Sequence, residues 1–215
     1  MALGNRTLFA CLGGQIVLPG EGSLLLDRAD GGHLRVEPPR PVWERSELSP
    51  DELAQWSFLI AASGAAMLQT LPQLEGGCVN YWEASNWSLH DDAEPAGVKE
   101  VRAHRRMHMH LLGRSRTATD PHWKWGEAPH FPRFDARLEA SVGLRRLTAA
   151  ECAAVILRLA GLLRSRYDVS TADIQTSSAC PTCGYPFPGR SESARCADCA
   201  VEHRVRPSPA DHSSP

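Results

Sequence analysis

Hydrophobic and polar side chains alternate most regularly over residues 106–112, which read Arg-Met-His-Met-His-Leu-Leu. A period of two is typical of a β-strand, because successive side chains of a strand point to opposite faces. We therefore predict a strand here whose one face seals a core with Met107, Met109 and Leu111. Its other face carries Arg106, His108, His110 and Leu112.

Two capping boxes mark the starts of two long helices. Ser49-Pro50-Asp51-Glu52 supplies an N-cap serine, a proline at the first helical position and a glutamate three residues after the cap. Leu147-Thr148-Ala149-Ala150-Glu151 repeats the pattern with threonine. The hydrophobic patterns that follow predict helices that end near Leu71 and near Tyr167. Strands are predicted over 7–18 (with a bend at Gly13-Gly14), 24–27, 34–36 and 78–84.

The composition is that of an ordinary globular protein. The chain has 215 residues, of which 42% are hydrophobic and 22% charged, and its formal net charge is −2. This charge indicates no strong attraction to nucleic acid or to a membrane. The apolar run 8–18 is short and is interpreted as a strand rather than a signal peptide, so we expect a cytoplasmic protein that does not enter a membrane.

Four of the seven cysteines form two Cys-x-x-Cys pairs, Cys180 with Cys183 and Cys196 with Cys199. Two such turns can supply four thiolates to a tetrahedral zinc ion, and the segment is too short for a hydrophobic core of its own. Without a secretory signal, metal is favoured over disulfides or redox thiols. The pattern resembles a zinc ribbon with a closed, structural Zn²⁺ site. A protein or nucleic-acid partner of this module is left open.

The histidine-bearing face of the predicted strand suggests phosphate chemistry. It places two imidazoles about 7 Å apart at their Cα atoms. A guanidinium beside them is a fixed positive charge, while an imidazole can act as a nucleophile or carry a proton. Two alternatives remain from the residues alone: an exposed pair without a role, and a metal site, because neutral imidazole is a common zinc ligand.

Several segments in the same order resemble the histidine-triad family, whose signature is His-φ-His-φ-His-φ-φ with φ apolar. The second and third family histidines fall on His108 and His110, whereas Arg106 stands in place of the first. Upstream, the run 32–38 (Gly-His-Leu-Arg-Val-Glu-Pro) resembles the family's Gly-His-Leu-x-Val-x-Pro, and the helix start at 48–53 follows it at the usual place. The resemblance covers about residues 1–135.

This resemblance implies an α+β fold, a histidine-triad-like antiparallel sheet with packed helices, followed by the zinc-ribbon-like module. It implies a nucleotide phosphohydrolase or nucleotidyltransferase, similar to diadenosine polyphosphate hydrolases. His108 would attack the α-phosphorus to form a covalent nucleotidyl-histidine, and His110 and His33 would hold phosphate oxygens. The other residues expected to bind the nucleotide or dinucleoside polyphosphate substrate are Asn86, Arg102 and Arg106.

Two other functions remain open because Arg106 departs from the signature. The first is a nucleotide-binding module without catalysis. The second is a metal-dependent site built on His33, His108 and His110. A homodimer is also left open.

The chain divides into a larger domain and a small appendage. We predict a catalytic domain over 1–140, a helical segment over 141–168 and a linker over 169–179. The zinc-ribbon-like module is expected over 180–206, and a disordered tail over 207–215.

Overall fold

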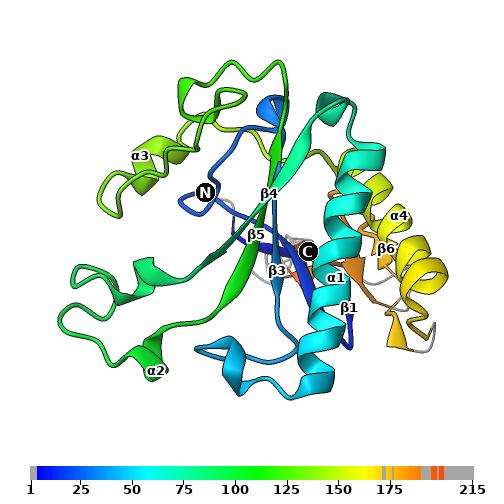
Figure 1. Ribbon diagram of the computed structural model, residues 1–215, viewed down its shortest axis with the longest axis horizontal. Coiled ribbons are helices and arrows are strands. Elements are labelled where there is room, and N and C mark those ends of the chain that lie inside the picture. Colours follow the sequence, from blue (N-terminus) through cyan, green and yellow to red (C-terminus); the bar gives the residue numbers. More distant parts are fainter. Residues whose placement is uncertain (1–3, 171–172, 176, 190–194, 198, 201–215) are drawn as a thin grey trace, which may run out of the picture.

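The computed structural model describes residues 4–170, 173–175, 177–189, 195–197 and 199–200. Its centre is a five-stranded antiparallel sheet with the strand order β1-β2-β3-β5-β4 (Figure 1). The strands are β1 (Arg6–Cys11), β2 (Gly14–Leu18), β3 (His33–Glu37), β4 (Cys78–Ala84) and β5 (His108–Arg114). The predicted α+β class with an antiparallel sheet is confirmed.

Two long helices, α1 (Pro50–Thr70) and α4 (Ala149–Tyr167), begin at the predicted capping boxes. In each box the cap hydroxyl accepts from the backbone N–H of the glutamate, whose side chain accepts from the backbone N–H of the cap. The shorter helices are α2 (Val101–His104) and α3 (Arg137–Ser141), and the 3₁₀ turns are η1 (Arg28–Asp30), η2 (Arg45–Glu47), η3 (Pro72–Leu74), η4 (Asn86–Leu89) and η5 (Pro121–Trp123).

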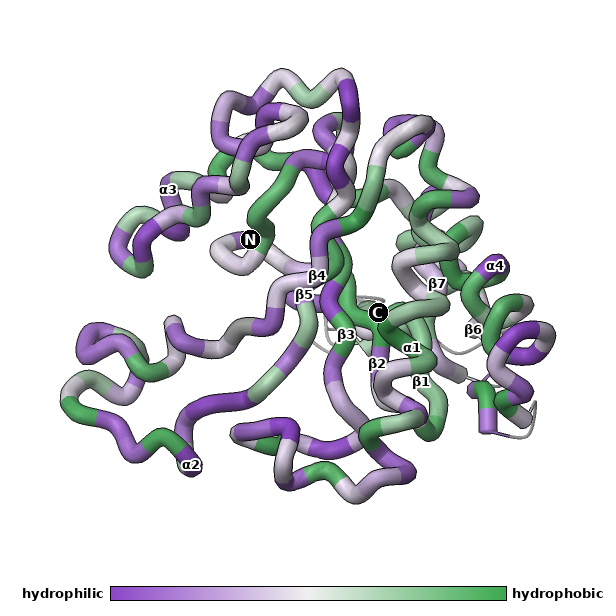
Figure 2. The backbone as a smooth tube through the Cα atoms, viewed as in Figure 1, coloured by the Kyte–Doolittle hydropathy of each residue, from purple (hydrophilic) through white to green (hydrophobic). Residues whose placement is uncertain are grey.

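The main hydrophobic core lies between one face of the sheet and the helices α1 and α4. These helices lie side by side, and hydrophobic stretches gather where they meet the strands (Figures 1 and 2). Trp56 of α1 and Leu159 of α4 are fully buried in this core. The sheet contributes alternate positions of its strands, namely Ile16, Leu34, Val36, Met109 and Leu111.

The opposite face of the sheet is covered by loops and carries the histidines. His110 pairs with Arg35 on one neighbouring strand and with Trp82 on the other, so these three side chains share this face. Toward one end of the strands, Leu25, Leu112 and other apolar side chains form a second, smaller cluster. Beside this cluster, Arg35, Trp82 and His110 line a cavity.

Two strand predictions are corrected by the structure. The segment 7–18 is a hairpin rather than one strand, with Cys11 paired to Gly14. A Cβ at Gly13 would lie 2.5 Å from the carbonyl oxygen of Gln55, so only glycine allows this turn to approach α1. The segment 24–27 is not a strand, because the Asp27 carboxylate caps η1 and accepts from the backbone N–H and the guanidinium of Arg145. The predicted strand 34–36 lies in β3, which pairs with β2 and not with the segment 24–27.

The C-terminal segments pack against β1, at the edge of the sheet. The two short strands β6 (Ser177–Ala179) and β7 (Pro186–Pro188) pair with each other, and the Ser177 hydroxyl donates to the Leu8 carbonyl at 2.9 Å. Val169 and Ile174, which fall in the predicted linker 169–179, are buried in the main core. The predicted tail 207–215 and residues 201–206 of the module lie outside the described residues.

Candidate functional site

Three imidazoles from two neighbouring strands form a continuous row on the open face of the sheet. His33 begins β3, His108 begins β5, and His110 follows two residues later on the same face. His33 Nε2 lies 2.7 Å from His110 Nδ1, and His110 Nε2 lies 3.0 Å from His108 Nε2. We call His33, His110 and His108 the imidazole relay. The structure thus places the three predicted residues side by side, but His33 is 1% exposed and is absent from the described lining of the cavity, so it is not placed to hold phosphate oxygens directly.

The backbone at the two ends of the relay fixes the direction of its hydrogen bonds. The Leu25 N–H donates to His33 Nδ1 at 3.2 Å, so a neutral His33 carries its proton on Nε2 and donates to His110. His110 then accepts at Nδ1 and donates through Nε2 to His108 Nε2. The remaining His108 proton lies on Nδ1, which donates to the Arg106 carbonyl at 2.9 Å. His108 therefore keeps its lone pair on Nε2.

All three imidazoles are held neutral. Burial lowers the pKa of His33 to about 3 and that of His108 to about 4, and the nearby Arg35 guanidinium acts in the same direction. Burial, followed by the neighbouring His33, lowers the pKa of His110 well below its ordinary value. An imidazole that is unprotonated at neutral pH has the lone pair that nucleophilic attack requires.

A cavity of about 660 Å³ opens in front of His108 and His110. This volume is within the usual range for sites that bind small molecules. The cavity is cationic, because three arginines line it and Glu37 is the sole acidic residue among the described lining residues. The arginines are Arg35, Arg40 and Arg106. An anionic ligand such as a phosphate ester suits this charge.

The other predicted binding residues have different positions. Arg106 lies just before β5, is exposed at the cavity wall, and donates to the carbonyl oxygens of Arg105 and Arg102. Asn86 is exposed and lines the cavity. Arg102 is absent from the described lining of the cavity, and its guanidinium lies over the Trp43 ring, 4.9 Å from its centroid.

Two residues that sequence reasoning missed hold the relay in place. Trp82 stacks on His110 with ring centroids 5.2 Å apart, and the Trp82 ring also stacks with Phe131 at 3.9 Å. The buried Ser85 donates to the Arg106 carbonyl, and its hydroxyl lies 3.3 Å from His108 Nδ1. Trp82 could have been found from the pairing of β4 with β5, whereas Ser85 lies after the strand and gave no pattern.

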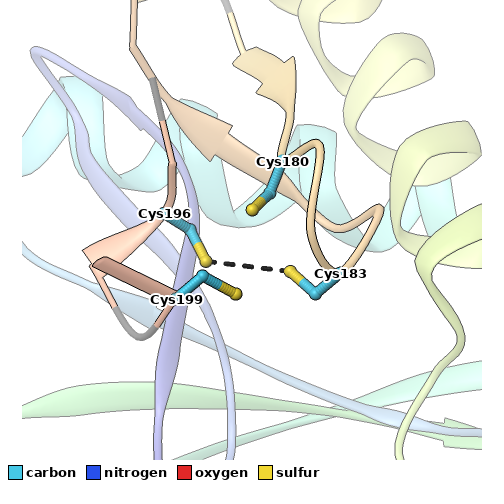
Figure 3. A group of neighbouring side chains, drawn as sticks. All are labelled: Cys180, Cys183, Cys196 and Cys199. Atoms are coloured by element: carbon cyan, nitrogen blue, oxygen red, sulfur yellow. Dashed lines mark hydrogen bonds between the residues drawn. The ribbon is translucent and has the colours of Figure 1, made fainter. Parts of the chain in front are cut away.

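The four predicted metal ligands converge at the C-terminal end of the described chain (Figure 3). Their sulfur atoms all lie within 4.8 Å of one another, and the Cys183 and Cys196 sulfurs are 3.7 Å apart. Four thiolates at about 2.3 Å from a tetrahedral metal have sulfur–sulfur separations of about 3.8 Å. The four cysteines could therefore hold a metal ion with little movement.

Arg6 of β1 connects this cysteine cluster to the sheet. Its guanidinium donates to Cys183 Sγ and lies 3.6 Å from Cys196 Sγ, and it covers the Tyr185 ring with 4.7 Å to the centroid. Arg6 is 8% exposed, so its charge acts at short range with little solvent screening. If the four cysteines bind a metal as thiolates, this buried guanidinium would offset part of their negative charge.

Comparison of the chain with protein-family models, with curated proteins and with solved structures finds no match in any of the three. Among the described residues, none of the helices is both long enough and apolar enough to span a lipid bilayer. Any function assigned to the cavity must therefore be argued from the residues and the geometry given above.

Proposed function

We propose that the protein is a nucleotide phosphohydrolase or nucleotidyltransferase that acts through a covalent nucleotidyl-histidine on His108. The observation that carries the proposal is the direction of the imidazole relay. It leaves His108 neutral at a cationic cavity, with an unprotonated Nε2 that accepts from His110 and an Nδ1 proton that is bound to the Arg106 carbonyl. This arrangement supports nucleophilic attack on phosphorus more than it supports nucleotide binding without catalysis or a metal site.

In the first step, the His108 Nε2 lone pair forms a bond to the α-phosphorus of the nucleotide. The bond from phosphorus to the leaving oxygen breaks, and the leaving group takes its electron pair. The hydrogen bond from His110 Nε2 to His108 Nε2 breaks as the lone pair attacks, and the His110 N–H then donates to a phosphoryl oxygen, where it stabilises developing negative charge. His33 is a positioning residue, because its bond to His110 Nδ1 keeps the His110 proton on Nε2.

In the second step, water or another acceptor attacks the same phosphorus. The nitrogen–phosphorus bond breaks, and its electron pair returns to His108 Nε2. The proton of the acceptor leaves to solvent. The two steps yield a nucleoside monophosphate with water, a nucleotidyl ester with an alcohol, or a phosphoric anhydride with a phosphate acceptor.

Arg106 selects the leaving group in this proposal. A guanidinium stays protonated, so it stabilises phosphate charge but is a poor proton donor. A nucleoside polyphosphate leaves as an anion and needs no proton, whereas a phosphoramidate leaves as an amine that must be protonated. We expect kcat/KM for dinucleoside polyphosphates to exceed that for nucleoside phosphoramidates by at least about tenfold. Faster phosphoramidate cleavage would contradict this role of Arg106.

A nucleotide-binding module without catalysis is the main alternative, and His108→Ala separates it from an enzyme. The enzyme predicts that His108→Ala loses at least about 10³-fold in turnover and still binds nucleotide. The alternative predicts the same background turnover in the variant and the unchanged protein.

A metal site on the relay is the second alternative. The relay nitrogens are 2.7 and 3.0 Å apart, which are hydrogen-bond distances. Two nitrogens at about 2.0 Å from one tetrahedral zinc would be about 3.3 Å apart. We propose instead that Zn²⁺ is held by the four cysteines alone, in a closed and structural site. Metal analysis should give one zinc per chain, whereas two would favour a second metal at the relay.

A further inference from the structure

A half-buried arginine of β3 adjoins the relay but has no part in its hydrogen bonds. Arg35 is paired in register with His110, lines the cavity, and its side chain is 14% exposed. Glu37 is its one hydrogen-bond partner among the described residues, through Nη2 to Oε1 at 2.5 Å. The Arg35 Nε atom is buried without a partner. A guanidinium has five N–H donors, so most of its capacity remains for a ligand.

We propose that Arg35 forms an anion subsite that binds a phosphoryl group of the substrate beside the imidazole relay. This inference rests on the proposed function, because it places the phosphate chain of a nucleotide in the same cavity. It assigns to Arg35, rather than to the exposed Arg106, the main stabilisation of phosphate charge. The physical reason is that a charge–charge contact in a partly buried, poorly solvated position is stronger than one at the surface.

Glu37 holds Arg35 in place when the subsite is free and competes with the ligand for the guanidinium. Its carboxylate is the acidic group that faces the cavity, so it repels an entering phosphate. Removal of the Glu37 charge should therefore tighten the binding of anions, while removal of the Arg35 charge should weaken it. A merely structural ion pair would instead give the same loss from both changes.

The test uses inorganic pyrophosphate as the probe and the zinc-loaded chain of 215 residues, with Kd measured by calorimetry at constant ionic strength. We expect Arg35→Gln to raise Kd at least about tenfold, Arg35→Lys to give an intermediate value, and Glu37→Gln to lower Kd. Arg40→Gln is the matched control. Arg40 lines the same cavity and is also paired with a glutamate, Glu52, but its side chain is 47% exposed against 14% for Arg35. Solvent screens its charge more strongly, so Arg40→Gln should raise Kd by no more than about threefold.

An unchanged Kd in Arg35→Gln, or an equal loss in Arg40→Gln, would overturn the subsite. If Arg35→Gln does not fold, the opposite shifts of Arg35→Lys and Glu37→Gln decide the matter, and parallel shifts reject it. The proposed function fails separately. If pyrophosphate binding depends on Arg35 but no covalent adduct forms on His108, the subsite stands and the covalent mechanism is rejected. If Arg35→Gln forms the His108 adduct as the unchanged protein does, the mechanism stands and the subsite is rejected.

Discussion

The neutral, buried relay makes a specific prediction about acid sensitivity. The unfolded chain binds a proton on each histidine at about pH 6.5, whereas the pKa of His33 is about 3 in the folded state. Between these values the unfolded state binds more protons, so the free energy of unfolding is highest above pH 6.5 and falls as the pH is lowered toward 3.

The size of the effect follows from the two pKa values of His33. For a histidine that stays neutral in the folded state, each pH unit below 6.5 lowers the free energy of unfolding by about 1.4 kcal/mol. At pH 5 this gives about 2 kcal/mol for His33, and a similar amount for His108, whose folded pKa is about 4. The carboxylates of Asp27 and Glu151 have lowered pKa values and act only below about pH 4.5. The change in the free energy of unfolding between pH 6.5 and 5 therefore reports the protonation of the histidines.

The assay compares the unchanged protein with His33→Gln by urea unfolding at pH 7.5, 6 and 5, with zinc present throughout. Glutamine accepts from the Leu25 N–H and donates to His110 but does not titrate. Between pH 7.5 and 5 the variant should lose about 2 kcal/mol less stability than the unchanged protein. Parallel pH dependences of the two proteins would refute a buried, neutral His33.

Two further predictions concern the edges of the site. Arg6→Gln should speed the loss of zinc to a chelator about tenfold, because the Cys183 thiolate loses its guanidinium donor. A metal indicator dye measures the rate of zinc loss, and an unchanged rate would contradict this prediction. Gly31→Ala should lower the free energy of unfolding by at least about 3 kcal/mol, because φ of Gly31 is +144° and a Cβ there would lie 2.1 Å from the Gly113 carbonyl oxygen. Thermal unfolding measures the change, and a loss of less than about 1 kcal/mol would contradict this close approach.

Local patterns in the sequence were enough to predict the frame of the fold. The two capping boxes predicted the starts of α1 and α4. The period of two over 106–112 predicted β5 and its histidine-bearing face, although the strand begins two residues later and leaves Arg106 outside it. The spacing of the cysteines gave a cluster that the structure brings within metal-binding distance. The capping boxes and the strand period depend on residues that are close in the chain. The cysteine cluster depends on the preference of a tetrahedral metal for four thiolates.

Features that depend on distant contacts were not predictable in this way. The segment 24–27 has the hydrophobicity of a strand, but Asp27 bonds to Arg145, which is remote in sequence, and this favours a capped turn. Arg35 reads as one charge on a short strand until the pairing of β3 with β5 places it beside His110. The direction of the relay depends on the Leu25 N–H, whose position no sequence pattern indicates. The histidine-triad resemblance stays a prediction.

The most direct test of the proposed chemistry is mass spectrometry of the protein after brief mixing with nucleoside triphosphates and dinucleoside polyphosphates. The reaction is quenched in base, because a nitrogen–phosphorus bond breaks in acid. We predict one added nucleoside monophosphate on the peptide that contains His108, and none in His108→Ala. Turnover of these substrates without an adduct on His108 in either a quenched or a slowed reaction would contradict the covalent mechanism.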